Sequence, residues 1–183
     1  MALITIICSW LIADIITGIV HWFEDKCLSN ESKYTFIKSI IEDNNRHHKT
    51  PTSLCEQSIW FNINTSAAIA WPVALLLYIC GAPALVWLPV FFASFANIIH
   101  RWAHEKSVNV PRIVRSLQHI GLFCSKKHHA GHHYVDGKVI TRPQAQLRYC
   151  VMTNWLNPIL DRLRLFKKME RAIEFINFLR WRL

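Results

Sequence analysis

The sequence predicts an all-α protein, an integral membrane helical bundle with about three transmembrane helices. Hydrophobic residues make up 52% of the 183 residues and charged residues only 18%, which is too apolar for an ordinary soluble domain. The 44 residues from Gln57 to His100 contain no Lys, Arg, Asp or Glu. Nine of the ten histidines form four tight groups beside the apolar runs. We therefore expect one domain, residues 1–183, with a histidine-rich site at a membrane surface.

The first predicted span lies near residues 1–23, where Asp14 is the only charged residue. It lacks the basic start and the cleavage site of a secretory signal peptide, so we expect a retained helix. A carboxylate inside a membrane is costly, and Asp14 therefore predicts a polar partner. The charge-free run is long enough for two more spans of about 20 residues each. Because Gly81 and Pro83 can form a turn at its middle, we expect spans near residues 59–79 and 84–104.

Basic residues predict the topology and the nature of the C-terminal segment. Five of the 21 Lys and Arg residues lie between Glu24 and Glu56, and the other sixteen follow His100. Since basic loops stay on the cytoplasmic side, three spans place all the histidine groups at the cytoplasmic face. Residues 156–183 mix apolar and basic residues at helical spacing, which predicts amphipathic helices on anionic lipid. The net charge of +9 thus indicates a membrane partner and no nucleic acid.

The histidine spacing is the main indication of chemistry. His100 and His104 are one helical turn apart, so both rings can bind the same ion. His129, His132 and His133 also repeat at intervals of three and four residues. Adjacent rings such as those of His132 and His133 point about 100 degrees apart on a helix, which favours two metal ions over one.

Two further histidine groups complete the set. His21 ends the first span, and Asp25 follows one turn later, where its carboxylate could accept the outer ring N–H and fix the tautomer. His47 and His48 lie in the expected loop before the helical hairpin. A lone histidine at a membrane interface is usually a polar anchor, and histidine-rich tracts can bind zinc adventitiously. Four groups on one membrane side favour a dedicated metal centre over those alternatives.

The available donors limit the metal and the reaction. Imidazole suits iron, zinc, copper and nickel, and the absence of cysteine beside the groups argues against copper(I) and iron–sulfur clusters. The motifs also lack the glutamate base of a hydrolytic HExxH zinc site. Two irons with neutral ligands would activate dioxygen next to a bundle that can present an alkyl chain. Dehydrogenation or hydroxylation of a lipid chain is the expected class of reaction.

These motifs resemble the membrane lipid desaturase family that includes plasmanylethanolamine desaturase and the plastid palmitoyl-phosphatidylglycerol desaturase. The resemblance runs in order through residues 13–25, 46–51, 97–104, 117–118, 129–133, 149–150 and 155–157. It implies two iron ions, dioxygen as co-substrate, a phospholipid substrate, and electrons from a donor such as cytochrome b5 or ferredoxin. We expect the endoplasmic reticulum or a bacterial inner membrane, with the metal site on the cytoplasmic face.

The resemblance also implies a role for each matching residue. The implied iron ligands are His21, His47, His48, His100, His104, His129, His132 and His133. The residues implied to surround these ligands are Asp25, Asn64, Asn97 and His128. No catalytic residue is expected beyond the metal ligands, and His119 is expected not to be one.

Two departures from the family pattern affect the interpretation. The family usually has an additional membrane segment before the Ala13-Asp14 motif, and this chain starts inside it, so it is either a compact version or a fragment. The stretch between His133 and Cys150 is longer than in the family and lacks its usual proline. Because this stretch adjoins the implied ligands, the identity of the lipid substrate stays open.

The leading prediction is an oxygen-dependent, di-iron desaturase of a phospholipid alkyl or acyl chain. The specific activity that we expect is like that of plasmanylethanolamine desaturase, which forms a vinyl ether and so produces a plasmalogen. One alternative is a lipid hydroxylase or an acyl-lipid desaturase on the same irons, because these reactions share the first C–H cleavage. Another is a non-catalytic metal-binding membrane protein, which predicts zinc in place of iron and no change in lipids.

Overall fold

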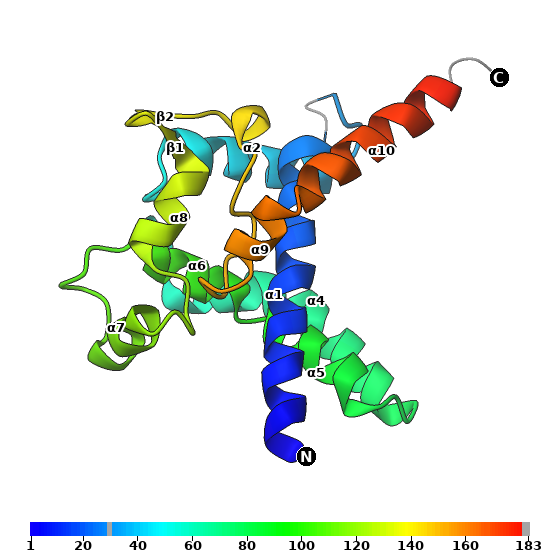
Figure 1. Ribbon diagram of the computed structural model, residues 1–183, viewed down its shortest axis with the longest axis vertical. Coiled ribbons are helices and arrows are strands. Elements are labelled where there is room, and N and C mark those ends of the chain that lie inside the picture. The colour runs from blue at the N-terminus through cyan, green and yellow to red at the C-terminus, as the bar shows by residue number, and fades with distance from the viewer. Residues whose placement is uncertain (29–30, 181–183) are drawn as a thin grey trace.

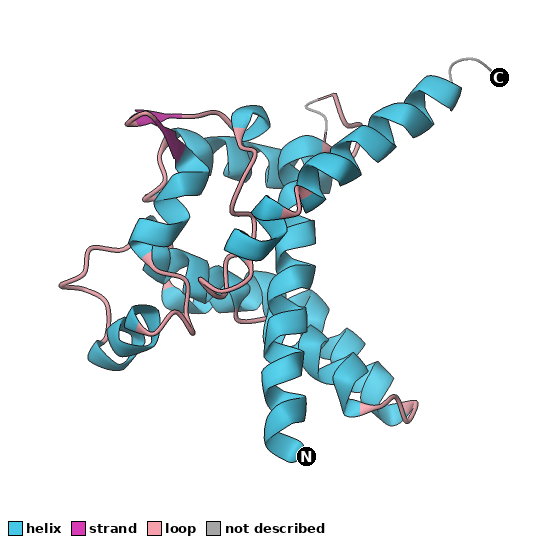
Figure 2. Ribbon diagram, viewed as in Figure 1, coloured by secondary structure: helices cyan, strands magenta, loops and turns pink. Residues whose placement is uncertain are grey.

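A computed structural model describes residues 1–28 and 31–180 and shows a chain that is mostly helical and has almost no strand (Figures 1 and 2). The helices are α1 (Ala2–Lys26), α2 (Thr35–Lys49), α3 (Ser53–Glu56), α4 (Ile59–Ile79), α5 (Ala84–Ala93), α6 (Ala96–His104), α7 (Arg112–His119), α8 (Lys126–His133), α9 (Asn157–Arg162), α10 (Leu165–Arg180) and the 3-10 helix η1 (Arg142–Gln144). Strand β1 (Tyr134–Val135) pairs antiparallel with β2 (Lys138–Val139). The predicted all-α class is confirmed.

Three helical segments form the membrane bundle. α1 and α4 are each long and apolar enough to cross a membrane, and α5 with α6 makes a third span if the bent pair counts as one. α1 packs against α5, and α5 packs against α4. Leu75, Leu76 and Ile79 of α4 are among the exposed apolar side chains that lipid would cover. The N-terminus and the α4–α5 turn lie at one end of the bundle, opposite α2 and α10 (Figure 1).

The third predicted span, residues 84–104, is bent. The helix axis changes direction by 41° between α5 and α6. At the bend, the Ser94 hydroxyl accepts the Trp71 indole N–H at 3.0 Å, and the Ser94 carbonyl accepts the Ser66 hydroxyl at 2.9 Å. These contacts with α4 satisfy polar groups at the break, which is what a bent membrane helix requires. As a result, α6 leaves the direction of α5 and packs against α8.

The pair His47 and His48 lies in the last turn of a helix, so the prediction of a loop there is wrong. The buried residues of α2 are Ile41, His47 and His48. Ile37 and Ile41 fall on the same helical face as His48, and this spacing is the signal for a helix. α2 ends two residues before Pro51, because the residue that precedes a proline disfavours the helical conformation.

The longer stretch after His133 is ordered. It contains the β1–β2 hairpin, whose turn residues Asp136 and Gly137 have φ of 49° and 75°, as a two-residue type I′ turn requires. Farther on, the guanidinium of Arg142 donates to the backbone carbonyls of Glu24 and Leu28 at the C-terminal end of α1. The stretch is therefore a small folded unit attached to the first span.

The C-terminal segment forms two helices, α9 and α10, with Arg164 between them at φ 53°. Leu160 and Phe166 are buried against the bundle, whereas Leu163 and Ile176 are exposed. The predicted amphipathic character is thus present, although a break separates the two helices. Residues 181–183 of the predicted segment lie outside the described residues.

A buried carboxylate joins the first span to the segment that precedes α9. Asp14 is fully buried. Its Oδ1 accepts the Met152 N–H at 2.9 Å, and its Oδ2 accepts the Thr153 hydroxyl at 2.6 Å. One turn farther along α1, a Cβ at Gly18 would lie 2.7 Å from Cys150 Sγ, so glycine permits the close approach of this segment. The polar partner predicted for Asp14 is therefore this backbone segment.

We expect Asp14→Leu to lower the free energy of unfolding by about 2 to 3 kcal/mol, because it leaves a buried amide and a buried hydroxyl without an acceptor. Asp14→Asn keeps one acceptor oxygen and is the matched control, with a smaller loss. Thermal unfolding of the purified protein in detergent measures both variants. A Leu variant as stable as the unchanged protein would contradict this role of Asp14.

Candidate metal centre

Eight histidines from four helices meet inside the molecule. They come from α1, α2, α6 and α8, and none is more than 8% exposed. Together with one carboxylate, they form two groups, in each of which the donor atoms lie within 4.8 Å of one another. The five-histidine group consists of His47, His100, His104, His129 and His133, and the histidine–carboxylate group of His21, Asp25, His48 and His132.

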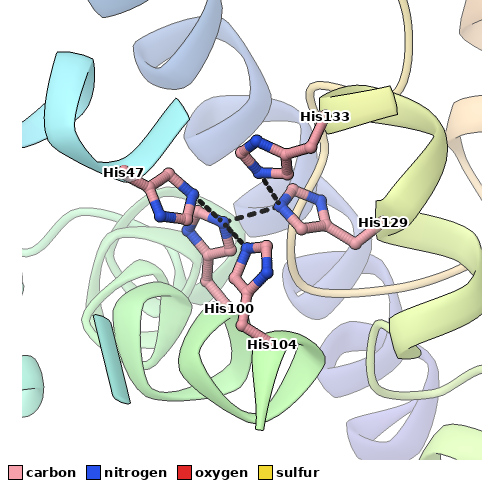
Figure 3. A group of neighbouring side chains, drawn as sticks. All are labelled: His47, His100, His104, His129 and His133. Atoms are coloured by element: carbon pink, nitrogen blue, oxygen red, sulfur yellow. Dashed lines mark hydrogen bonds between the residues drawn. The ribbon is translucent and has the colours of Figure 1, made fainter. Parts of the chain in front are cut away.

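The rings of the five-histidine group point toward a common centre (Figure 3). The Nε2 atom of His100 lies 3.1 Å from that of His47, 3.1 Å from that of His104 and 2.7 Å from that of His129. His133 Nε2 lies 3.0 Å from His129 Nε2. A ring nitrogen carries either one N–H or one lone pair, so His100 Nε2 can hydrogen-bond to only one of its three neighbours. Lone pairs that converge in this way suit a cation.

Asp25 lies inside the histidine–carboxylate group and not in the outer position that the sequence predicts. Its Oδ2 is 3.1 Å from His48 Nε2, 3.2 Å from His132 Nε2 and 3.7 Å from His21 Nε2. Asp25 Oδ1 is buried with no hydrogen-bond partner among the described residues. The difference arises because α1 brings Asp25 to the inward-facing nitrogens of three rings. Its carboxylate can therefore bind an ion directly.

Backbone carbonyls fix two rings of the histidine–carboxylate group. His21 Nδ1 lies 3.1 Å from the Tyr149 carbonyl oxygen, and His132 Nδ1 lies 2.8 Å from that of Leu147. A carbonyl can only accept a hydrogen bond, so both Nδ1 atoms carry the proton and both Nε2 atoms offer lone pairs. This is the tautomer that a metal site needs, and outer partners of this kind orient metal-binding histidines.

Helix geometry divides the adjacent histidines between the groups. Successive side chains on a helix point about 100 degrees apart. On α2, His47 joins the five-histidine group and His48 the other, and on α8, His133 and His132 divide in the same way. The ring centroids of His48 and His133 are 4.7 Å apart, so the two groups adjoin.

Three of the histidines outside the membrane spans, His47, His129 and His133, are held in the neutral form. Burial lowers the pKa of His47, His129 and His133 well below the usual value, and neighbouring imidazoles lower it further. Neutral imidazole is the form that binds a metal ion. The surroundings of these rings therefore favour the metal-binding state near neutral pH.

Two asparagines predicted to surround the site, Asn64 and Asn97, make no hydrogen bond to its histidines among the described residues. Asn64 is exposed on α4. Asn97 donates to the Thr65 hydroxyl at 2.9 Å. Within the described residues no hydrogen bond joins either asparagine to the histidines, since Asn97, although it lies on α6 three residues before His100, bonds across to α4.

The other two histidines also lie outside both groups. His128 Nε2 is 3.1 Å from the amide nitrogen of Asn157 and accepts its N–H. Burial and the nearby Arg148 guanidinium lower the pKa of His128 to about 4, so this ring stays neutral as an acceptor. His119 is exposed at the end of α7, which agrees with its predicted exclusion from the ligands.

Tyr149 supports the site although the histidine spacing gives no indication of it. It is fully buried, and its ring centroid is 5.0 Å from that of His132 and 5.9 Å from that of His21. Its hydroxyl donates to the Ala145 carbonyl at 2.5 Å, and burial raises its pKa, so the hydroxyl stays protonated. The sequence could not indicate the role of the carbonyls of residues 147 and 149, because every residue has a backbone carbonyl.

These features define a helical membrane protein with a buried, histidine-rich candidate metal centre. Residues 10–182 match the family model described as the lipid desaturase domain, and the chain therefore belongs to the lipid desaturase family.

Named relatives agree with this membership. The chain is 29% identical to fatty acid desaturase 4-like 2, chloroplastic, of Arabidopsis thaliana, over 90% of this chain and 57% of the relative. It is 29% identical to a probable fatty acid desaturase of Acanthamoeba polyphaga mimivirus, over 94% and 82% of the two chains. It is 27% identical to the plasmanylethanolamine desaturase of Myxococcus xanthus, over 94% and 60%. The chain thus spans less than two thirds of the plant and Myxococcus relatives. No solved structure matches it.

We expect removal of bound metal by a chelator to increase amide hydrogen exchange in the last turn of α2 and in α8. Few side chains of α2 are buried, and two of them are His47 and His48, so ligation would supply much of the attachment of this helix. The contact between α1 and α5 is the internal control and should keep its protection. Unchanged exchange in α2, with metal loss verified by elemental analysis, would contradict the site.

Proposed function

We propose that the chain is an oxygen-dependent, di-iron desaturase that acts on an alkyl or acyl chain of a membrane phospholipid. The main support is the pair of adjoining buried donor groups at one end of an apolar bundle, in a chain of the lipid desaturase family. We further propose that the activity is that of a plasmanylethanolamine desaturase, the name of the Myxococcus relative. The reaction would remove two hydrogens from adjacent chain carbons beside the ether oxygen and leave a vinyl ether.

Nine side chains are proposed to hold two irons, one ion in each group. The eight proposed histidine ligands are His21, His47, His48, His100, His104, His129, His132 and His133. Asp25 is proposed as the ninth ligand because its carboxylate lies within reach of His21, His48 and His132. The donor set fits, because imidazole and carboxylate without thiolate suit iron. The inward His132 Nε2 and Asp25 Oδ1 are also buried without hydrogen-bond partners among the described residues. When bound, iron supplies the activation of dioxygen that C–H cleavage requires.

The groups that surround the proposed centre would orient the ligands and exclude water. The carbonyls of residues 147 and 149 hold His21 and His132 in one tautomer. Near-complete burial of the rings keeps solvent out of the centre, which protects reactive species from side reactions. The carboxylate of Asp25 offsets part of the ionic charge in one group, whereas the five-histidine group has only neutral donors.

We also propose the orientation and the partners. Basic regions precede and follow the apolar run, which supports a cytoplasmic position for the centre, in the endoplasmic reticulum or a bacterial inner membrane. Desaturation takes two electrons from the lipid, while reduction of dioxygen to water takes four. A donor such as cytochrome b5 or ferredoxin would therefore supply the other two electrons.

Alanine at His100 or His132 should reduce product formation to background and lower the iron content below about two ions per chain. These variants each remove one donor, from different groups. His119→Ala is the matched control, because His119 is exposed and distant from both groups, and it should keep activity and iron. Elemental analysis and product assay of membrane-inserted protein measure the outcome. Full activity of His100→Ala would refute the ligand assignment.

Expression in cells supplied with alkyl ether lipids should yield lipids that have lost two hydrogens and that release aldehydes in acid. The vinyl ether hydrolyses to an aldehyde, whereas an ordinary chain double bond does not. Mass spectrometry with and without oxygen makes the comparison. A gain of one oxygen atom would indicate the hydroxylase, and zinc in the protein with unchanged lipids would indicate a non-catalytic metal-binding protein.

A further inference from the structure

A pocket of about 300 Å³ lies beside the histidine–carboxylate group, on the side of α9 and α10. Its apolar wall includes Trp22, Tyr149, Leu160 and Phe166. The Tyr149 ring separates the pocket from the centre, because its centroid is 4.8 Å from that of Phe166 and 5.0 Å from that of His132. The pocket is thus one aromatic ring away from the proposed ligands, and it is distinct from them.

The pocket carries positive charge without a matching partner. Arg164 and Lys167 line it, and neither side chain has an ion-pair or hydrogen-bond partner in the described part of the chain. The two carboxylates at the same pocket are already engaged. Asp161 accepts the backbone N–H of Arg148 at 3.2 Å, and Glu170 lies 3.4 Å from the Lys26 ammonium. Because Lys26 already pairs with Glu170, the two cationic side chains without a partner outnumber the one carboxylate that lacks a cationic partner, Asp161, and their N–H groups are available to an anion.

The backbone at Arg164 is strained in a way that keeps this cation at the pocket. Its φ is 53°, a conformation that usually calls for glycine at the end of a helix. A non-glycine residue in this region costs free energy and is retained where the surrounding structure uses it. Arg164 stands between α9 and α10, and from there its side chain reaches the pocket lining.

A second polar group at the pocket also has no partner. Trp22 is 3% exposed, and its indole N–H makes no hydrogen bond within the described residues. A buried donor without an acceptor is costly. Because Trp22 lines the pocket, a small shift of its indole ring on binding would let an anionic oxygen accept this N–H.

We infer that the pocket binds the phosphodiester of a phospholipid, with Arg164 and Lys167 as its cationic partners and the Trp22 N–H as a donor. The inference rests on the proposed function for the identity of the bound lipid as substrate. A guanidinium suits phosphate because it presents several N–H donors in one plane. The pocket lies at the histidine end of α1, and the exposed Leu163, which directly follows α9, is available to lipid.

The position of the pocket has a consequence for the bond that is oxidised. With the phosphate held one ring away from the histidine–carboxylate group, the chain carbons nearest the glycerol are those that reach the centre. The enzyme would then select carbons by counting from the head group and not from the methyl end. The carbons next to an ether oxygen satisfy this geometry.

Binding to the purified, metal-containing full chain without an electron donor tests the pocket apart from turnover. The probes are a water-soluble short-chain phosphatidylethanolamine, the corresponding diacylglycerol without phosphate, and inorganic phosphate. Arg164→Gly removes the cation while suiting the backbone, so it should weaken binding of the phospholipid by about tenfold or more without loss of folding. Lys168→Gln removes one exposed positive charge next to the pocket lining, and it should change binding less than about twofold.

Each outcome of this experiment decides the inference. Phospholipid that binds the Arg164→Gly variant as tightly as the unchanged protein would overturn it, and so would an equal loss in Lys168→Gln. Tight binding of inorganic phosphate without binding of the phospholipid would identify a free-phosphate site instead. Equal binding of the diacylglycerol would show that the phosphate is not recognised.

Product analysis separates this inference from the proposed function. With substrates of several chain lengths, the double bond should stay at a constant number of carbons from the glycerol. A constant distance from the methyl end would refute the head-group position while leaving the desaturase assignment intact. If lipid binding depends on Arg164 but the protein forms no desaturated product, the phosphate pocket would be supported and the desaturase assignment would be refuted.

Discussion

Eight buried imidazoles cannot satisfy one another's hydrogen-bonding needs, and the fold is organised around this constraint. A ring nitrogen offers one proton or one lone pair, yet His100 Nε2 has three ring nitrogens within 3.1 Å. Burial favours the neutral rings, so repulsion between charges is avoided but a surplus of lone pairs is left. A pair of cations is the simplest way to satisfy that surplus. Two of the four helices that carry the rings are short, with nine residues in α6 and eight in α8.

The segment from Ala145 to Thr153 supports the centre without contributing a ligand. Its carbonyls fix the outer nitrogens of two rings, and its own position depends on groups in the bundle. Asp14 binds its C-terminal end, and the Asn157 amide bonds to both the N–H and the carbonyl of Cys150. The intramembrane carboxylate is thus connected to the orientation of the His21 and His132 rings through hydrogen bonds to this one segment.

Much of the fold and of the candidate centre could be predicted from the sequence, for definite physical reasons. Long charge-free runs specify membrane helices, and helical spacing of histidines specifies which rings share a face. The bend at Ser94 could not be predicted, because it depends on hydroxyl and indole contacts from another helix. The inward position of Asp25 depends on how α1, α2 and α8 cross, which no local pattern encodes. The C-terminal break is marked only by Arg164, a residue without a turn preference.

The adjacent histidines on α2 and α8 limit where this chain can change in length. A residue inserted within either helix before its pair would rotate both rings by about 100 degrees, and both groups would lose a donor at once. The stretch from Tyr134 to Gln144 is different, since its hairpin is exposed and Arg142 attaches it to α1 independently of the rings. Insertions and deletions among relatives should therefore accumulate in the hairpin and be absent from the helices beside it, because changes of length in the hairpin leave the buried histidines in place.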